Sequence, residues 1–228
     1  MRPLTRVLVP FGVIPFMLSA SSCRTASAAV TIPDPVVDVP LASAPGQRVA
    51  VFAGGCFWGV QAVFEHVRGV ISATAGYSGG TVPSPDYEQV SSGTTGHAES
   101  VRIVFDPSKI TYGQLLKVFF AVAHDPTELD RQGPDVGTQY RSAIFVTNSG
   151  QQRVAEAYIK QLDAAHVYAS PIVTRVVPFT AFYDAEAYHQ DFAARHPDNA
   201  YIVINDAPKV ANLQRELPGL YSPAPARP

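Results

Sequence analysis

One cysteine stands where a thiol could act as a nucleophile. Cys56 follows Gly54 and Gly55 in the segment AGGCFWGV, between the hydrophobic run RVAVFAG and a helical pattern. That pattern places hydrophobic residues at i, i+3, i+4 and i+7, namely Val60, Val63, Phe64 and Val67. Unpaired N–H groups and the dipole at a helix start stabilise a thiolate, so we expect the pKa of Cys56 to be lowered. A buried, inert cysteine is the alternative, because free cysteines are among the most buried residues.

Two aromatic residues, Phe57 and Trp58, follow Cys56 and lie off the hydrophobic face of the predicted helix. Aromatic walls beside a thiol form an apolar slot that suits a small uncharged alkyl group. Ordinary core packing is the alternative for both rings. The only other cysteine, Cys23, lies in a segment that resembles an export signal, so Cys56 has no evident partner for a structural disulfide.

The first 28 residues are typical of a signal peptide. Arg2 and Arg6 precede an apolar run that prolines interrupt and that is too short to span a bilayer comfortably. Residues 26–28 then form an A-x-A cleavage site, so we expect an exported protein, periplasmic or secreted. Lipidation at Cys23 is the alternative and would anchor the chain to a membrane. Simple cleavage is favoured because the leucine that usually opens a lipidation motif is missing.

Composition limits the other classes of function. The 228 residues suit one domain with extensions, and a formal net charge of −2 provides no basic surface for nucleic acid or an anionic membrane. Six histidines without metal-site spacing predict no metal. Prolines mark residues 29–47 as an arm or linker and residues 207–228 as a tail, which leaves residues 48–206 as the folded domain.

The elements of this domain are predicted from their periodicity. Strand patterns cover residues 48–54, 70–80, 99–106, 141–147 and 172–179. Helices are expected after Cys56, after a capping box of Thr111 and Gln114, after a similar pair of Ser149 and Gln152, and over residues 184–196. Residues 83–99 and 124–140 are long polar loops of the kind that often carries function. Strands and helices without a regular βαβ order predict an α+β fold: a two-layer sandwich with a central mixed sheet, packed helices, a ferredoxin-like core and long loops around the site.

Five segments resemble the A-type peptide methionine sulfoxide reductases. They are GGCFWGV, GYSGG, PDYEQVSSGTTGHAE, FFAVAHDPTELDRQGPDVGTQYRSAIF and AYHQDF. One short motif would be weak evidence, but five in order across residues 48–206 are specific and imply that this is the catalytic domain. The resemblance implies reduction of the S epimer of methionine sulfoxide, free or in proteins, with no bound cofactor.

The resemblance also implies a role for the thiol and its aromatic neighbours. Cys56 would attack the sulfoxide sulfur, and Phe57 and Trp58 would hold the S-methyl group of the substrate. The product on Cys56 would be a sulfenic acid.

The oxygen of the sulfoxide needs acidic donors, because it is a poor leaving group until it is protonated. The resemblance implies that Glu99 protonates it and that Tyr87 and Tyr140 lie beside it. We expect burial near aromatic rings to raise the pKa of Glu99. Asp135 corresponds to a carboxylate that orders the site, although it could serve only its own loop, and His97 could simply pack beside the site.

The second half of the cycle departs from the family pattern. Many members carry one or two further cysteines near the C-terminus, which attack the sulfenic acid and pass a disulfide to thioredoxin. This sequence has no cysteine after Cys56. We therefore expect an external thiol to regenerate Cys56, with thioredoxin, glutaredoxin and small-molecule thiols all open. We expect the protein to be a monomer.

Three other functions are weighed against this one. A Cys-dependent hydrolase needs a histidine base and an oxyanion hole, and the aromatic pair would crowd an acyl group. A non-enzymatic methionine-binding module would keep its function after Cys56→Ser. A peroxide-reducing thiol protein normally places a threonine and an arginine around the thiol, and nothing in this sequence marks such a set.

Overall fold

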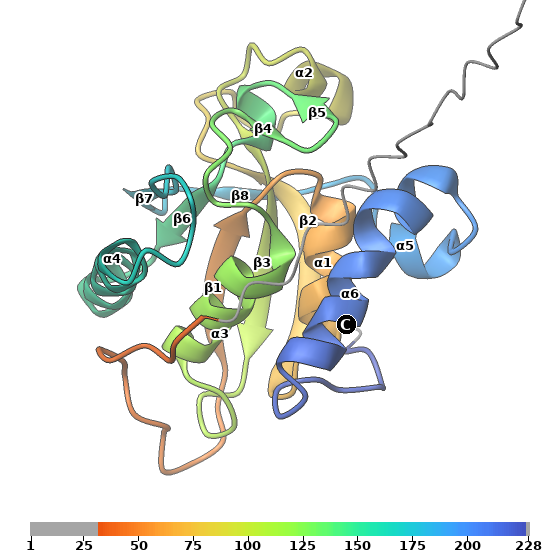
Figure 1. The fold of residues 1–228 in the computed structure, drawn as a ribbon. Coiled ribbons are helices and arrows are strands. Elements are labelled where there is room, and N and C mark those ends of the chain that lie inside the picture. Colours follow the sequence, from red (N-terminus) through yellow and green to blue (C-terminus); the bar gives the residue numbers. More distant parts are fainter. Residues whose placement is uncertain (1–31, 227–228) are drawn as a thin grey trace, which may run out of the picture.

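A six-stranded sheet forms the centre of the computed structural model, which describes residues 32–226 (Figure 1). The strand order is β7-β6-β1-β3-β2-β8. The strands are β1 (Arg48–Ala53), β2 (Val70–Ser78), β3 (Ala98–Phe105), β6 (Ala143–Val146), β7 (Arg175–Pro178) and β8 (Phe182–Asp184). Only β6 and β7 are parallel, so the sheet is mixed. The central order β6-β1-β3-β2, with helices after β1 and β3, is a ferredoxin-like core and confirms the predicted α+β fold.

Helices pack on one face of this sheet. They are α1 (Phe57–Glu65), α3 (Tyr112–Val118), α4 (Ser149–Ala164) and α6 (Ala207–Glu216), with π-helical turns η1 (Phe119–Ala123) and η3 (Ile202–Asp206). The main core lies between these layers, where the ring of Phe52 is 5.6 Å from that of Phe64 and 4.9 Å from that of Phe119. Side chains alternate along a strand, so Val51 faces a smaller cluster on the other side.

Shorter elements interrupt the predicted long loops. They are α2 (Tyr87–Ser91), β4 (Arg131–Gln132), β5 (Asp135–Val136), the 3₁₀ turn η2 (Thr138–Tyr140) and α5 (Phe192–Arg195). Figure 1 shows α2 and the β4–β5 hairpin together at one end of the sheet. The sequence did not predict α2, whose start is a capping box formed by Asp86 and Gln89. The segments are therefore structured, although they still project from the sheet as loops do.

The predicted starts of α3 and α4 have different outcomes. Thr111 accepts a hydrogen bond from the N–H of Gln114 at 3.1 Å, and the side chain of Gln114 accepts one from the N–H of Thr111 at 3.0 Å, which confirms the first capping box. The cap of α4 is one residue earlier than predicted: Asn148, not Ser149, accepts from the N–H of Gln151 at 3.0 Å. Asparagine caps a helix as well as serine does, so the composition did not distinguish them.

The continuous helix predicted over residues 184–196 is wrong. Strand β8 ends at Asp184, turns follow, and only the four residues of α5 are helical. The side chain of Gln190 accepts from the N–H of Ala75 at 3.0 Å and donates to its carbonyl at 2.9 Å. This contact with the distant strand β2 holds the segment in turns, where a local helical pattern would have continued.

Both flanks of the predicted domain make ordered contacts. The tyrosine hydroxyl of Tyr158 donates to the carbonyl of Pro33 at 2.7 Å, and Asp38 accepts from the N–H of Gly113 at 2.9 Å, so this part of the proline-rich arm lies along α3 and α4. Residues 207–216, which we assigned to a tail, form α6, and its Leu213 is buried. The predicted signal segment, residues 1–28, lies outside the described residues. Within residues 32–226, no helix combines the length and the apolar character that crossing a bilayer requires.

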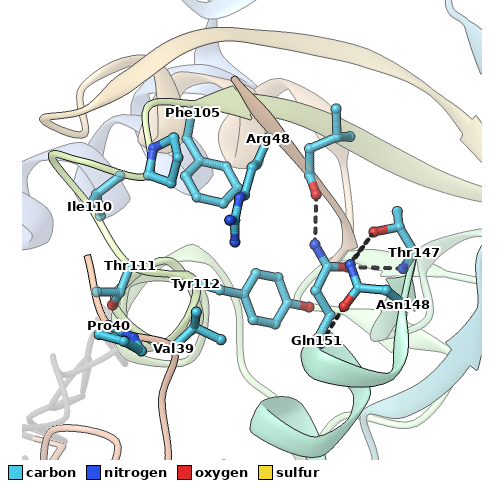
Figure 2. A pocket seen from close by; sticks show the side chains of 12 residues that line it. Val39, Pro40, Arg48, Phe105, Ile110, Thr111, Tyr112, Thr147, Asn148 and Gln151 are labelled. Atoms are coloured by element: carbon cyan, nitrogen blue, oxygen red, sulfur yellow. Dashed lines mark hydrogen bonds between the residues drawn. The ribbon is translucent and has the colours of Figure 1, made fainter. Parts of the chain in front are cut away.

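A cavity of about 280 Å³ lies between the arm, β1, α3 and the start of α4 (Figure 2). Arg48 and Tyr112 are among its lining residues. The side chain of Gln151 is fully engaged there, because it accepts from the N–H of Thr147 at 2.9 Å and donates to the carbonyl of Val49 at 2.7 Å. The buried hydroxyl of Tyr112 has no hydrogen-bond partner among the described residues. Cys56 lies in a second, separate cavity, and no residue lines both cavities.

Candidate active site

Cys56 occupies the N-cap position of α1, directly after β1 and the two glycines, as predicted. Gly55 turns the chain with a φ of +86°, which glycine adopts far more readily than other residues, and a Cβ there would lie 2.5 Å from the side chain of Gln132. Cys56 is 8% exposed, and no disulfide involves it in the described part of the chain. The thiol therefore has a fixed position at the helix start.

A cavity of about 210 Å³ brings all seven predicted site residues together. Its lining consists of Cys56, Phe57, Trp58, Tyr87, Glu99, Asp135, Tyr140 and Tyr201. They come from α1, α2, β3, β5, η2 and the turn before η3. The two predicted polar segments supply four of these residues, namely Tyr87, Glu99, Asp135 and Tyr140, so their functional interpretation agrees with the geometry.

The pKa of Cys56 is shifted in the direction opposite to the one we expected. Burial raises the pKa of this thiol well above its ordinary value, and the carboxyl groups of Glu99 and Asp206 raise it further. The N–H of Trp58 and the ammonium group of Lys209 lower it by less. The predicted lowering was wrong because desolvation outweighs the favourable field at the start of α1.

Glu99 has the raised pKa that we expected. It is 3% exposed on β3, and its Oε2 accepts from the N–H of Phe57 at 3.0 Å. Burial is the main cause that raises the pKa of Glu99 to about 8, with a further contribution from Asp135 and Asp206, while the bond from Phe57 acts in the opposite direction. At neutral pH the carboxyl group is mostly protonated, so Glu99 can give a proton to an acceptor in the cavity.

Tyr87 and Tyr140 retain their phenolic protons, because burial raises the pKa of each. Glu186 positions the first of them: it accepts from the N–H of Tyr87 at 2.8 Å and from the hydroxyl of Tyr77 at 2.9 Å. Gln139, next to Tyr140, donates to the carbonyl of Ser91 at 3.0 Å and so joins η2 to α2. Two O–H donors are thus supplied to the cavity from loops that are bonded to one another.

The aromatic walls are held by other rings. Phe57 is buried, with its ring 5.8 Å from Tyr77 and 5.1 Å from His189. The half-buried Trp58 stacks on Phe192 at 3.8 Å, and its indole N–H donates to Nδ1 of His189 at 3.2 Å. Neither ring can rotate freely, so the apolar side of the cavity keeps its shape.

Three residues near the site were missed by the sequence analysis. The hydroxyl of Tyr201 donates to Asp135, which fixes that carboxylate at the cavity wall. Asp206 is fully buried and forms an ion pair with Lys209 at 3.1 Å. The i, i+3 spacing of the acid and the base was the only local signal, and our tail boundary at residue 207 separated them.

His97 has a structural environment. Its Nδ1 accepts from the N–H of Gly80 at 3.1 Å, so its Nε2 donates to the carbonyl of Val82 at 2.8 Å. His97 does not line the cavity, and its two hydrogen bonds tie the loop after β2 to the start of β3. In the part of the chain that the structure describes, no cluster of three or more histidine, cysteine or acidic side chains could hold a metal ion.

Comparison with known proteins gives consistent matches. A family model described as peptide methionine sulfoxide reductase matches residues 48–219. Peptide methionine sulfoxide reductase MsrA 2 of Mesorhizobium japonicum is 58% identical over 183 residues, which cover 80% of this chain and 94% of that protein. MsrA 2 of Synechocystis is 53% identical over 187 residues, covering 81% and 87%. The structure of methionine sulfoxide reductase A of Corynebacterium diphtheriae is similar with a TM-score of 0.58 and 34% identity, covering 74% of this chain and 88% of that one.

Proposed function

The chain belongs to the A-type peptide methionine sulfoxide reductases, which reduce methionine sulfoxide with thiols, and on that premise we propose that Cys56 is the nucleophile of this reaction. The observation that carries this assignment is the composition of one cavity. A thiol, a carboxyl group that is protonated at neutral pH, and two phenols line the same volume beside two aromatic walls. This is the set of groups that sulfoxide reduction needs.

The first half-reaction transfers one oxygen atom. Cys56 attacks the sulfoxide sulfur as a thiolate while Glu99 protonates the sulfoxide oxygen. An S–S bond forms between Cys56 and the substrate, and the S–O bond breaks as the protonated oxygen leaves as water. A water molecule then attacks the sulfur of Cys56, the S–S bond breaks with its electron pair going to methionine, and Cys56 becomes a sulfenic acid; the proton that this water releases balances the second proton taken up by the leaving oxygen. Methionine sulfur gains two electrons and the sulfur of Cys56 loses two. The proton that Glu99 gives is balanced by the proton that the thiol loses, so no other oxidant or reductant is needed.

The other lining residues hold the substrate for this step. Phe57 and Trp58 form the apolar side, which suits the S-methyl group. Tyr87 and Tyr140 donate to the oxygen, where negative charge develops in the transition state. Asp135 acts indirectly, through its hydrogen bond from Tyr201 at the cavity wall. A methyl group and an oxygen held on opposite sides select one sulfoxide epimer, which we assign as the S epimer, whether methionine sulfoxide is free or in a protein.

The second half-reaction consumes two external thiols. One thiol attacks the sulfenic acid of Cys56, water leaves, and a mixed disulfide forms; a second thiol then releases Cys56 and leaves with the disulfide. The assignment rests on the sequence, which has no cysteine after Cys56. Thioredoxin, glutaredoxin and small thiols fit this chemistry, and no bound cofactor is required. We also propose that the protein is exported as a monomer, with cleavage after residue 28 favoured over lipidation at Cys23.

A single-turnover experiment without added thiol tests the assignment. The reduced protein is mixed with a methionine sulfoxide peptide and then treated with dimedone, which labels sulfenic acids. We expect one equivalent of methionine and one dimedone adduct on the peptide that contains Cys56. Cys23→Ser is the matched control and should behave as wild type, while Cys56→Ser should give neither product. Full substrate conversion without an adduct on Cys56 would exclude the mechanism.

A further inference from the structure

The start of α6 carries a buried ion pair at the point where the helix continues directly from the π-helical turn η3. Asp206 is the last residue of η3 and directly precedes α6, and its side chain accepts no backbone N–H there. Lys209 is the third residue of α6. The two side chains pair with each other instead, at 3.1 Å, with Asp206 fully buried and Lys209 17% exposed.

The ion pair lies against the first turn of α1. A Cβ on Gly59 would lie 2.1 Å from Oδ1 of Asp206 and 2.8 Å from Nζ of Lys209, so only glycine allows this approach. Gly59 is the third residue after the N-cap Cys56, so both lie in the first turn of α1. The ion pair and the thiol therefore share one turn of α1.

The carboxylate of Asp206 is only partly satisfied. Its Oδ2 is buried and has no hydrogen-bond partner among the described residues. A buried carboxylate that is incompletely bonded acts strongly on neighbouring ionisations, because water does not screen it. Asp206 raises the pKa of the Cys56 thiol, whereas Lys209 lowers it. The other titratable groups that face this thiol across the cavity are Glu99, Asp135, Tyr87, Tyr140 and Tyr201.

We propose that Asp206 and Lys209 are positioning residues that set how readily Cys56 ionises. Lys209 favours the thiolate, and Asp206 holds Lys209 in place while opposing that thiolate. A thiol that is kept protonated reacts slowly with oxidants, so the ion pair restrains Cys56 without blocking it. This inference rests on the proposed nucleophilic role of Cys56.

Alkylation of Cys56 by iodoacetamide across a range of pH tests the inference in the full chain. Mass spectrometry of the peptide that contains Cys56 excludes any signal from Cys23. At neutral pH we expect Lys209→Met to alkylate about threefold to tenfold more slowly than wild type, because a tenfold change in the thiolate fraction corresponds to one pKa unit. We expect Asp206→Asn to alkylate faster, with the profile moved to lower pH, and Lys209→Arg to restore the wild-type profile.

The opposite directions separate this role from a purely structural one. Loss of packing alone would change stability in both variants and would not move their pH profiles in opposite senses. Equal profiles, or displacements in the same direction, would overturn the inference. Thermal unfolding identifies a variant that does not fold, and if Asp206→Asn is one, the contrast between Lys209→Met and Lys209→Arg decides alone. The assay uses no sulfoxide, so its failure is distinct from a failure of the dimedone experiment.

Discussion

Replacing Glu99 by glutamine removes the acidic proton while keeping the size of the side chain. The structure raises the pKa of Glu99 from the ordinary 4.5 to about 8. At pH 7 about nine in ten Glu99 side chains are then protonated, which is roughly 300-fold more than for an ordinary glutamate. Positioned general acids contribute about 10²-fold to 10⁴-fold to a rate, so we expect Glu99→Gln to slow methionine formation by that factor.

The pH profile of the same reaction gives a second, independent measure. Cys56 reacts as a thiolate and its pKa lies above that of Glu99, so wild-type activity should rise with pH up to about 8 and then level off as Glu99 loses its proton. The glutamine variant should lack this levelling, and its activity should continue to rise above pH 8 as more Cys56 ionises. The assay is chromatographic quantification of methionine from an S-sulfoxide peptide with dithiothreitol as reductant. Near-normal activity in Glu99→Gln, or a profile that still levels off near pH 8 in it, would refute the assignment of Glu99 as the proton donor.

Stability should depend on the same ionisation. The unfolded chain loses the Glu99 proton near pH 4.5, whereas the folded protein keeps it up to about pH 8. The folded protein is therefore favoured most below pH 4.5 and loses this contribution as pH rises through 8. The difference in pKa corresponds to at most about 5 kcal/mol. Glu99→Gln should flatten this part of the curve of unfolding free energy against pH, measured with urea.

Two further substitutions test the packing. Gly59→Ala should lower the free energy of unfolding by about 1 to 3 kcal/mol, because its Cβ would meet the carboxylate of Asp206. Gly46→Ala is the control and should cost little, because the nearest atom to its Cβ would be 3.9 Å away. Equal urea midpoints for the two variants would contradict this prediction. Tyr112→Phe should leave thermal stability unchanged or slightly higher, because it removes a buried hydroxyl that has no partner among the described residues. Tyr158→Phe should lower stability by about 1 kcal/mol, because it removes the hydrogen bond to Pro33. A higher thermal midpoint for Tyr158→Phe than for Tyr112→Phe would disprove this prediction.

The position of Cys56 could be predicted because its signals are local. Two glycines and a change from strand to helical periodicity specify the turn and the helix start, and Thr111 identifies its own cap in the same way. Tyr87, Glu99, Asp135 and Tyr140 come from four other elements, and no spacing rule joins them to Cys56. Only the family resemblance connected them.

What the sequence analysis missed depends on contacts between distant segments. Asp206 and Lys209 reach α1 because α6 packs back across the helix, and no local pattern encodes that approach. The low pKa predicted for Cys56 followed from the helix start alone, whereas the burial that reverses it comes from the whole cavity. The turns of residues 185–191 similarly depend on Gln190 and its bonds to Ala75, 115 positions away in the sequence.

The C-terminal segment is fastened to the far end of α1. The N–H of Ser222 donates to the carbonyl of His66 at 2.7 Å, and that of Ala226 to the carbonyl of Glu65 at 2.6 Å. Cys56 begins the same helix, so the helix acts as a rigid spacer of roughly 15 Å between this segment and the thiol. A disulfide needs Cα atoms within about 7 Å. A cysteine substituted for Ser222 could therefore form a disulfide with Cys56 only after the segment detaches. The rate of disulfide formation would then measure how fast the C-terminal segment leaves α1.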